Sequence, residues 1–425
     1  MKIIRTKGRG AQQTAETLAA LEERGGAALD AVLPVVSRIV NDVRKQGDRA
    51  LLRYAAEFDG LSGVGALRVT PEEMAAAWKA ISPAMQLALT TAAEQIRGFA
   101  VEQLPASWSN EPIAGLMTGQ LVRPLGSVGC YVPSGRHPLP STLLMTAIPA
   151  QVAGVERIVV VSPKPAPETL AAAHLLGITE FYRLGGAHAV AALAYGTASI
   201  KRVDKIAGPG NIYVTAAKRL VAFDCSIDML AGPTEIVVTS ERGNAAAIAA
   251  DIVAQAEHDP DALAIFITTR VDLAKAVIAE VKVRSRNNTV AREALDSNGL
   301  VIIASSMEEA RTITNRLAAE HLTVDAASDL DWVQNAGSVF VGRWSAQPMG
   351  DYISGPNHTL PTGGMARVRG GLSVNDFVKL ITVQEYTAKG IRSLGPPAVL
   401  LAEAEGLIGH AEAIRTRIQK RRPRG

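Results

Sequence analysis

The sequence is poor in cysteine and has no long apolar run, and both shortages exclude classes of protein. Its 425 residues include two cysteines, Cys130 and Cys225, which are too few for a disulfide framework and form no CxxC site. Free thiols are typical of a reducing compartment, so we expect a cytoplasmic protein. The N-terminal MKIIRTKGRG is not followed by an apolar stretch, and no segment approaches about 18 consecutive apolar residues. We therefore expect neither a signal peptide nor a membrane span.

Aromatic residues and a strong charge of either sign are also lacking. Aromatics make up 4% of the chain, which offers little surface for stacking nucleic-acid bases. The net charge of +3 arises in residues 415–425, which carry no acid and the basic side chains Arg415, Arg417, Lys420, Arg421, Arg422 and Arg424. Such a tail can bind nucleic acid, but a solvated terminus is the more common case. We expect no nucleic-acid partner.

What the sequence does contain is an alternation of β-rich runs with helical stretches. The chain is too long for one ordinary core, so two or more domains are expected. After a helical first hundred residues, strands such as VERIVVVSP alternate with helices such as PLPSTLLMTAIPAQVAG, and a second such series follows residue 236. This pattern predicts an α/β fold of two modules with mostly parallel sheets, a helical N-terminal segment and a helical C-terminal tail.

The usual dinucleotide fingerprint, G-x-G-x-x-G, is missing, which argues against an ordinary Rossmann site. Glycines instead follow three strands of the first series, at Gly135, Gly185–Gly186 and Gly208–Gly210. Ligands in open α/β sheets bind beyond the carboxyl ends of strands, and glycine lets backbone amides approach an anion there. Ordinary tight turns would show the same glycines, so both interpretations remain open.

A polar stretch, VAQAEHDP, interrupts an apolar helix at residues 253–260. On a helix, Gln255 and His258 share a face, whereas Glu257 points about 100° away from His258. Inward-facing polar groups without partners are costly, and a metal ion would satisfy both. A helix end capped by histidine is the competing interpretation.

Two further polar clusters are candidates for chemistry. The segment GDYISGPNHTLPTGG, residues 350–364, is too rich in glycine and proline for a regular element, so we expect a functional loop carrying Asp351 and His358. Asp351, and His410 near the C-terminus, could complete a metal site. Glu320 and His321 lie between a predicted helix and strand, where a carboxylate and an imidazole suit acid–base catalysis. An exposed helix end would explain that last pair equally well.

Longer motifs together resemble the histidinol dehydrogenase family over essentially the whole chain. They are GCYVPSGRHPLPSTLLMTAIPAQVAGV, LGGAHAVAALAYGT, VDKIAGPGNIYVTAAKR, DMLAGPTEIVV, AQAEHD, AAEHLTV, GDYISGPNHTLPTGGMARVRGGLSVNDFVK and EAEGLIGH. The resemblance implies a zinc-dependent homodimeric enzyme of histidine biosynthesis that oxidises L-histidinol to L-histidine in two NAD-linked steps, through an aldehyde. It also implies two incomplete Rossmann-like domains, in agreement with the missing fingerprint.

Site residues follow from the resemblance. The zinc ligands fall on Gln255, His258, Asp351 and His410, and the acid–base pair falls on Glu320 and His321. Other substrate contacts fall on Thr234, His358 and Glu405, and NAD contacts fall on Tyr131, His188 and Asn211. The family's C-terminal tail enters the partner's active site, so Glu405 and His410 are expected to serve the other subunit.

The same resemblance suggests domain boundaries. We expect an N-terminal segment, residues 1–23, and a C-terminal tail, residues 377–425. Between them we expect a discontinuous α/β domain, residues 24–129 with 236–376, which carries the metal site and the catalytic pair. Residues 130–235 are expected to form an NAD-binding domain.

Three positions depart from the family pattern. His188 stands where glutamine is usual, Thr234 where serine is common, and Ser134 where glycine is usual. Cys130 beside Tyr131 could suggest a thiol nucleophile for aldehyde oxidation, but hydration of the aldehyde needs no thiol, and we do not expect one.

Other functions compete with this interpretation. A related zinc and NAD enzyme acting on another polyol, such as a sulfopropanediol, would be expected to lose the residues that bind imidazole, yet Glu405 and His410 are present. A metal-dependent hydrolase using Glu320, or a scaffold that binds nucleic acid through the basic tail, is a more distant alternative.

Overall fold

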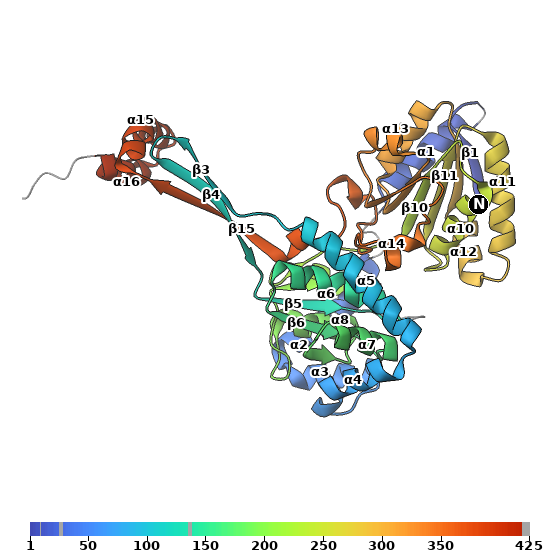
Figure 1. Ribbon diagram of the computed structural model, residues 1–425, viewed down its shortest axis with the longest axis horizontal. Coiled ribbons are helices and arrows are strands. Elements are labelled where there is room, and N and C mark those ends of the chain that lie inside the picture. The colour runs from blue at the N-terminus through green and yellow to red at the C-terminus, as the bar shows by residue number, and fades with distance from the viewer. Residues whose placement is uncertain (9, 25–28, 135–137, 419–425) are drawn as a thin grey trace, which may run out of the picture. The chain divides into compact units, whose positions relative to one another are not determined.

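The computed structural model describes residues 1–8, 10–24, 29–134 and 138–418, and many of its elements are labelled in Figure 1. Two compact units are present. The larger comprises Met1–Gln103 and Gly126–Phe377, and the smaller comprises Leu104–Leu125 and Val378–Gly425. The larger unit contains two six-stranded sheets, whose strands are parallel at all but one pairing. The predicted α/β class with mostly parallel sheets is confirmed.

The first sheet is entirely parallel and is buried on both faces. Its strand order is β1-β12-β11-β10-β13-β14, with bounds β1 (Lys2–Arg5), β10 (Glu235–Thr239), β11 (Leu263–Thr268), β12 (Gly299–Ile303), β13 (His321–Val324) and β14 (Ser338–Val341). Successive strand residues face opposite ways. Ile236 and Val238 therefore pack under one helix layer and Val237 under the other. The first layer is α10 (Ala245–Ala256), α11 (Val271–Arg284) and α12 (Thr289–Ser297), and the second is α1 (Ala11–Glu22) and α13 (Met307–Leu317).

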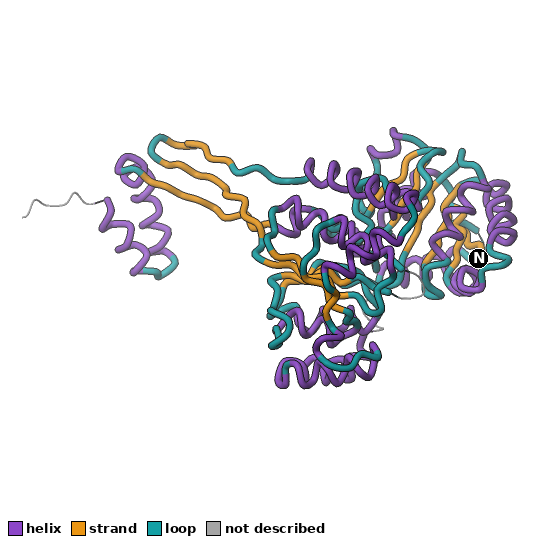
Figure 2. Tube along the Cα trace, turned by 60° about the horizontal axis from the view of Figure 1, so that its bottom comes forward, coloured by secondary structure: helices purple, strands orange, loops and turns teal. Residues whose placement is uncertain are grey.

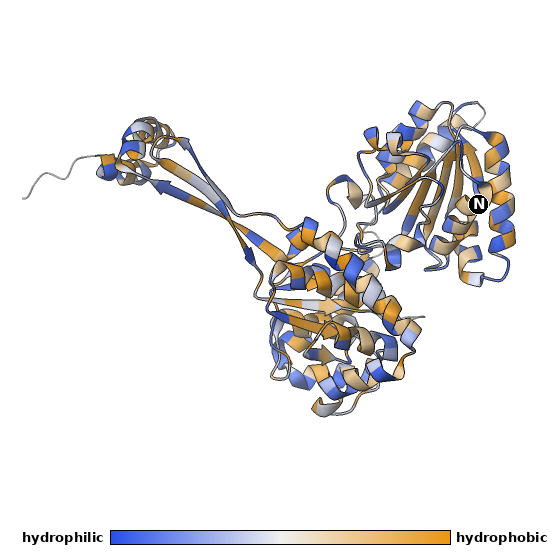
Figure 3. Ribbon diagram, in the orientation of Figure 1, coloured by the Kyte–Doolittle hydropathy of each residue, from blue (hydrophilic) through white to orange (hydrophobic). Residues whose placement is uncertain are grey.

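The second sheet has the order β2-β7-β6-β5-β8-β9, and only its edge pairing, β2 with β7, is antiparallel. Its strands are β2 (Arg68–Val69), β5 (Ser127–Tyr131), β6 (Arg157–Val161), β7 (Glu180–Tyr182), β8 (Lys205–Ala207) and β9 (Ser226–Ile227). One face is covered by α2 (Leu29–Gln46), α3 (Asp48–Tyr54), α8 (Gly186–Tyr195) and α9 (Ile212–Val221). Helix α6 (Pro140–Ala153) contacts β5 and β6. It also packs against α5 (Pro83–Glu102) and α7 (Pro167–Leu175). Helix α7 in turn contacts α4 (Pro71–Ala80). Figure 3 shows apolar strands between helices whose outer sides are polar.

The packing corrects the expected grouping of residues 24–129 with 236–376. The helices between residues 29 and 102 belong with the second sheet, because the apolar stripe of α2, which includes Val36, Val40 and Val43, is buried against α8 and α9. The first sheet instead recruits the N-terminus, since β1 pairs with β12. The expected helical N-terminal segment therefore begins with a strand.

The smaller unit is built on an antiparallel sheet that the sequence did not predict. Its order is β15-β4-β3, with β3 (Trp108–Ile113), β4 (Leu116–Pro124) and β15 (Val378–Tyr386), drawn as long strands in Figure 2. The tail is helical only after this strand, in α15 (Ala388–Ala404) and α16 (Ile408–Ile418). A Cβ atom at Gly390 would lie 2.1 Å from the carbonyl oxygen of Gly115, so glycine is required where α15 meets the β3–β4 turn. Across the described residues, no helix combines the length and apolar character needed to cross a bilayer.

The core of the first sheet supplies a stability test. Phe266 on β11 is fully buried, whereas Phe223 is fully exposed. We expect Phe266→Ala to destabilise this module by about 3–5 kcal/mol, because it leaves a cavity in close-packed surroundings. Urea denaturation measures the loss, and Phe223→Ala is the matched control that should leave the midpoint unchanged. Equal midpoints for the two variants would contradict the assigned packing.

Candidate active site

Glu320 and His321 lie at the start of β13, between its two neighbours β10 and β14. Helix α13 ends at Leu317, and Ala318 follows in the left-handed conformation with φ 46°, which turns the chain directly into the strand. Both side chains are buried, at 7% and 3% exposed, so the pair is not an exposed helix end. A carboxylate and an imidazole are thus held side by side on rigid structure.

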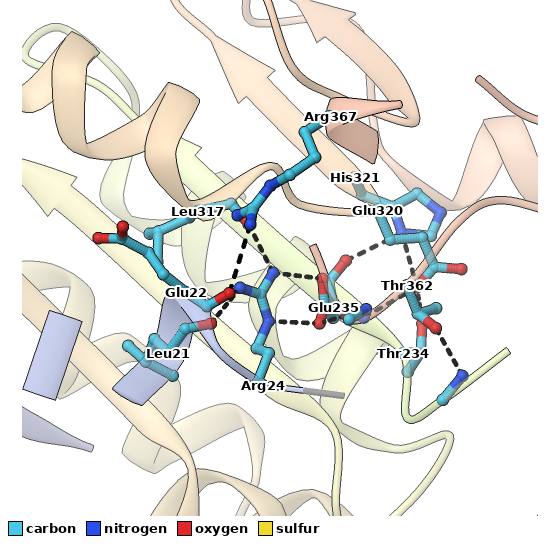
Figure 4. Close-up of polar contacts among 12 residues, drawn as sticks. Leu21, Glu22, Arg24, Thr234, Glu235, Leu317, Glu320, His321, Thr362 and Arg367 are labelled. Carbon is cyan, nitrogen blue, oxygen red and sulfur yellow. Dashed lines mark hydrogen bonds and ion pairs between the residues drawn. The ribbon is translucent and has the colours of Figure 1, made fainter. Parts of the chain in front are cut away.

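Main-chain and hydroxyl groups from the start of β10 orient this pair (Figure 4). The Oε2 atom of Glu320 accepts hydrogen bonds from the Thr234 hydroxyl at 2.6 Å and from the Glu235 N–H at 2.8 Å. The Nδ1 atom of His321 lies 3.1 Å from the Glu235 carbonyl oxygen. Because a carbonyl can only accept, Nδ1 carries a proton in either charge state of the ring, and Nε2 is the nitrogen that gains or loses the second proton.

Two carboxylates surround His321. Its Nδ1 lies 3.6 Å from Oε2 of Glu320, and its Nε2 lies 3.7 Å from Oδ1 of Asp351. Burial alone would lower the pKa of His321, but the two carboxylates outweigh burial and raise it to about 10. The raised pKa indicates a surplus of negative charge in this buried region.

Gln255 joins the same cluster from the last turn of α10. Its side chain is 2% exposed, and its Nε2 donates to the Thr234 hydroxyl. Its Oε1 is buried and has no hydrogen-bond partner among the residues that the structure describes. A buried acceptor without a donor is what a cation would satisfy.

His258 and Asp351 differ slightly from their expected settings. Helix α10 ends at Ala256, so His258 follows the helix and does not lie on its face, while Glu257 turns away and accepts from Asn288 at 2.9 Å. Asp351 belongs to a short helix, α14 (Pro348–Tyr352), and not to a loop. Five residues starting with proline are enough for one helical turn, which the glycine-rich composition concealed.

The charges around Asp351 show that several histidines converge on it. Burial alone would raise the pKa of its carboxyl, but three surrounding histidines lower it overall: His321, His358 and His258. Its Oδ2 accepts from Nε2 of Gln347 at 3.2 Å. His358 follows in the loop after α14. Its Nδ1 lies 2.8 Å from the Asp351 carbonyl oxygen and its Nε2 3.3 Å from the Thr142 hydroxyl on α6, and burial lowers its pKa.

Tested as zinc ligands, these donors fit in part. An imidazole, a carboxylate and the free amide oxygen of Gln255 are a mixed nitrogen and oxygen set of the kind zinc accepts. In the described part of the chain, no three His, Cys, Asp or Glu side chains are grouped as a complete metal site. The remaining expected residues, Glu405 and His410, lie in the smaller unit, where both are exposed near the turn between α15 and α16.

The glycine-bearing strand ends of the second sheet also come together. The Gly186 N–H donates to the Tyr131 hydroxyl at 3.0 Å, and a Cβ atom at Gly208 would lie 2.1 Å from the Tyr131 carbonyl oxygen. Asn211 caps α9, since its Oδ1 accepts from the N–H groups of Tyr213 and Val214. The N-termini of α8 and α9 therefore border one region, suited to an anion. Gly135 lies outside the described residues.

A buried ion pair holds the Gly208 turn in place. Lys218 and Asp228 pair with each other, at 2% and 4% exposed. The Lys218 ammonium donates to the Gly208 carbonyl at 3.0 Å, and the Gly208 N–H donates to Asp228 at 2.7 Å. Both main-chain groups of this glycine are thus fixed by charged side chains.

His188 occupies a different setting from the other expected NAD contacts. It is 1% exposed, and its Nε2 lies 2.8 Å from Oδ2 of Asp59, which also accepts from the Gly185 N–H at 3.4 Å. The ring packs beside Tyr54 and Phe58. His188 therefore supports the N-terminus of α8 from within the core.

Comparison with known proteins agrees with this arrangement. The family model for histidinol dehydrogenase matches residues 22–418. A histidinol dehydrogenase of Methanothermobacter thermautotrophicus is 46% identical over 413 residues, covering 94% of this chain and 96% of its own, and one of Geobacillus kaustophilus is 44% identical over 432 residues, covering 99% and 100%. The crystal structure of histidinol dehydrogenase from Elizabethkingia anophelis superposes with a TM-score of 0.92 at 34% identity, covering 98% of each chain.

The chain belongs to the histidinol dehydrogenase family. The resemblance inferred from the motifs is confirmed, and an NAD-linked oxidoreductase is the class of enzyme to which the family belongs.

Two departures from the family pattern have simple structural settings. Thr234 keeps the hydroxyl that serine would offer, and this hydroxyl bonds Glu320. Ser134 donates to the Pro163 carbonyl oxygen and so ties the loop after β5 to the end of the neighbouring strand, β6.

Two residues beside the site, Arg24 and Glu235, were missed in the sequence. Glu235 is 3% exposed and binds Arg24 through both carboxylate oxygens. A glutamate opening the otherwise apolar run EIVV was the available signal. Nothing local marks Arg24, because its partner lies 211 residues away.

Cys130 provides a test of whether a thiol takes part. It is fully buried on β5, and burial raises the pKa of its thiol to about 12, while that of Cys225 rises to about 11. Thiolates are the reactive form, so we expect no alkylation of either residue by iodoacetamide in the native protein at pH 8. Mass spectrometry should show both labelled once the chain is unfolded. Rapid native labelling of Cys130 would contradict this assignment.

Proposed function

We propose that this protein oxidises L-histidinol to L-histidine in two NAD-linked steps, through an aldehyde held in the site. The observation that carries the proposal is the buried Glu320–His321 pair with Asp351 beside it, in a chain of the histidinol dehydrogenase family. Two adjacent groups able to accept protons suit two successive oxidations, since each oxidation releases one proton from oxygen as a hydride leaves carbon.

His321 is the proposed base for the alcohol. With Nδ1 bonded to the Glu235 carbonyl, its Nε2 can accept the hydroxyl proton as the hydride leaves carbon for the nicotinamide. Glu320 is the proposed base for hydration of the aldehyde. Its Oε2 is held by Thr234 and Glu235, so Oε1 remains to take a proton from water as the water oxygen bonds the carbonyl carbon. The resulting anionic hydrate transfers a second hydride to a second molecule of NAD and becomes the carboxylic acid.

A zinc ion is proposed at Gln255, His258 and Asp351, completed by the partner subunit's His410 in a homodimer. Bound there, zinc would anchor the imidazole and amine of the substrate and fix its orientation. The free Oε1 of Gln255 and the carboxylate of Asp351 support this placement. His358 and the partner subunit's Glu405 are the further proposed substrate contacts.

The proposed NAD site borders the N-termini of α8 and α9. Tyr131 and Asn211 are the proposed contacts, because each lies at a glycine-bearing strand end where helix dipoles favour a pyrophosphate. His188 is proposed to act indirectly, by holding the Gly185 turn through Asp59. Two free cysteines fit a reducing, cytoplasmic setting.

Stoichiometry tests the proposed reaction. Purified protein supplied with zinc should form two NADH per histidinol consumed, measured at 340 nm against histidine quantified by mass spectrometry. A yield of one NADH, oxidation of a sulfonated propanediol in preference to histidinol, or no turnover would each contradict the proposal.

Variants of Glu320 and of His321 should impair different steps of the reaction. We expect Glu320→Gln to slow hydration about 10²–10⁴-fold, so that an aldehyde can be trapped by a hydrazine reagent. His321→Asn should slow the first oxidation by a similar factor and yield no trapped aldehyde. Identical behaviour of the two variants would refute the separate roles.

Zinc binding can be measured independently of enzymatic turnover. We expect Gln255→Ala and His258→Asn each to lower zinc affinity at least about tenfold, measured by competition with a chromophoric chelator. His174→Asn is the control, because His174 is an exposed residue of α7. Unchanged zinc affinity in both variants would show that the metal site lies elsewhere.

A further inference from the structure

Glu235 is a buried carboxylate, and both of its oxygens accept hydrogen bonds from other parts of the chain. Its Oε1 lies 2.6 Å from Nε of Arg24 and its Oε2 lies 2.7 Å from Nη2, so the ion pair is bidentate (Figure 4). The Gly363 N–H also donates to Oε1 at 3.0 Å. Such geometry offsets much of the cost of burying two charges.

The main chain of the same residue binds both members of the acid–base pair. Its N–H donates to Oε2 of Glu320 at 2.8 Å, and its carbonyl oxygen lies 3.1 Å from Nδ1 of His321. The position of one residue therefore sets the orientation of the carboxylate and the tautomer of the imidazole. Any shift of residue 235 is transmitted to both.

Arg24 links Glu235 to the end of α13, the helix that directly precedes Glu320 and His321. Its Nη1 donates to the Leu21 carbonyl at 2.5 Å, and its Nη2 donates to the Leu317 carbonyl at 2.7 Å. Leu317 is the last residue of α13, three residues before Glu320. The guanidinium therefore fixes both the start of β10 and the end of α13, and satisfies a helix carbonyl that would otherwise lack a donor.

We propose that the Arg24–Glu235 ion pair is a positioning device for the acid–base pair, acting through the main chain of residue 235 and the end of α13. The inference rests on the roles proposed for Glu320 and His321. Without Arg24, Glu235 would be a buried, unpaired carboxylate beside Glu320, and their repulsion would displace the start of β10. A displacement of about 1 Å can cost about 10²-fold in rate.

A matched pair elsewhere separates positioning from general stability. Arg157 and Glu180 form another bidentate Arg–Glu pair, at 2.7 and 2.8 Å, on β6 and β7 of the second sheet. Neither residue contacts the proposed site. Arg157→Met therefore removes a pair of the same bidentate geometry, although Glu180 is more exposed than Glu235, and serves as the control for Arg24→Met.

The test compares kcat and KM for histidinol in zinc-loaded wild type, Arg24→Met, Arg24→Lys, Glu235→Gln and Arg157→Met. We expect Arg24→Met to lower kcat about 30–300-fold with KM for histidinol and NAD within about threefold of wild type. Arg24→Lys should recover part of the loss, because it keeps the charge without the bidentate geometry. The double variant Arg24→Met with Glu235→Gln should lose less than the product of the single losses, because it removes both charges.

A tautomer measurement gives a readout that stability alone would not change. In zinc-loaded protein labelled with ¹⁵N-histidine, at a pH where the His321 ring is neutral, NMR should show His321 protonated at Nδ1 in wild type and in Arg157→Met, and a mixture of tautomers in Arg24→Met. An unchanged kcat and tautomer in Arg24→Met would overturn the proposal, as would equal losses of kcat in Arg24→Met and Arg157→Met. If Arg24→Met does not fold, Arg24→Lys answers the same question.

The wild-type measurement distinguishes failure of the proposed function from failure of the proposed positioning role. Wild type that does not oxidise histidinol would refute the proposed function whatever the variants do. Wild type that oxidises histidinol, with Arg24→Met matching it in kcat, would refute the positioning role alone.

Discussion

The parallel pairing of β10 with β13 is the interaction on which the site depends. Its register places Ile236 opposite His321, so Thr234 and Glu235, at the start of one strand, lie beside Glu320 and His321 at the start of the other. Backbone hydrogen bonds set this register with little freedom, because a slip of one residue would move every side chain of the strand to the opposite face of the sheet, into the wrong helix layer. The geometry of the proposed acid–base pair thus follows from the packing of the sheet.

The two sheets use opposite edges. In the second sheet, Tyr131 ends β5, and Gly185 and Gly208 follow β7 and β8, so all three lie at the carboxyl edge, as ligand sites in α/β sheets usually do. In the first sheet the proposed acid–base pair, Glu320 and His321, lies just before and at the start of β13, hence at the amino edge. The α10 end bearing Gln255 belongs to this edge too, because a crossover helix returns the chain toward the start of the next strand.

Much of the fold was readable in the sequence, because buried parallel strands and their helices leave strong patterns. The strands β3 and β15 were missed because almost all of their residues are exposed and show no alternation. The burial of Glu320 and His321 could not be decided locally, since it depends on pairing with β10, whose Glu235 lies 86 residues before His321, as well as with β14. The identities of the candidate site residues came from the family resemblance, and Arg24 was found only through its distant partner.

Charge explains why these residues suit a cation. Three carboxylates, those of Glu235, Glu320 and Asp351, lie in one buried region, and Arg24 neutralises only the first. His321, even when protonated, supplies one positive charge for the other two. Buried negative charge without a counter-charge is strongly unfavourable, and the orphaned Oε1 of Gln255 adds an acceptor without a donor. A divalent cation would neutralise this negative charge and would also coordinate the unpaired Oε1 of Gln255. The carboxylate of Glu235 needs no such cation, because Arg24 already neutralises it.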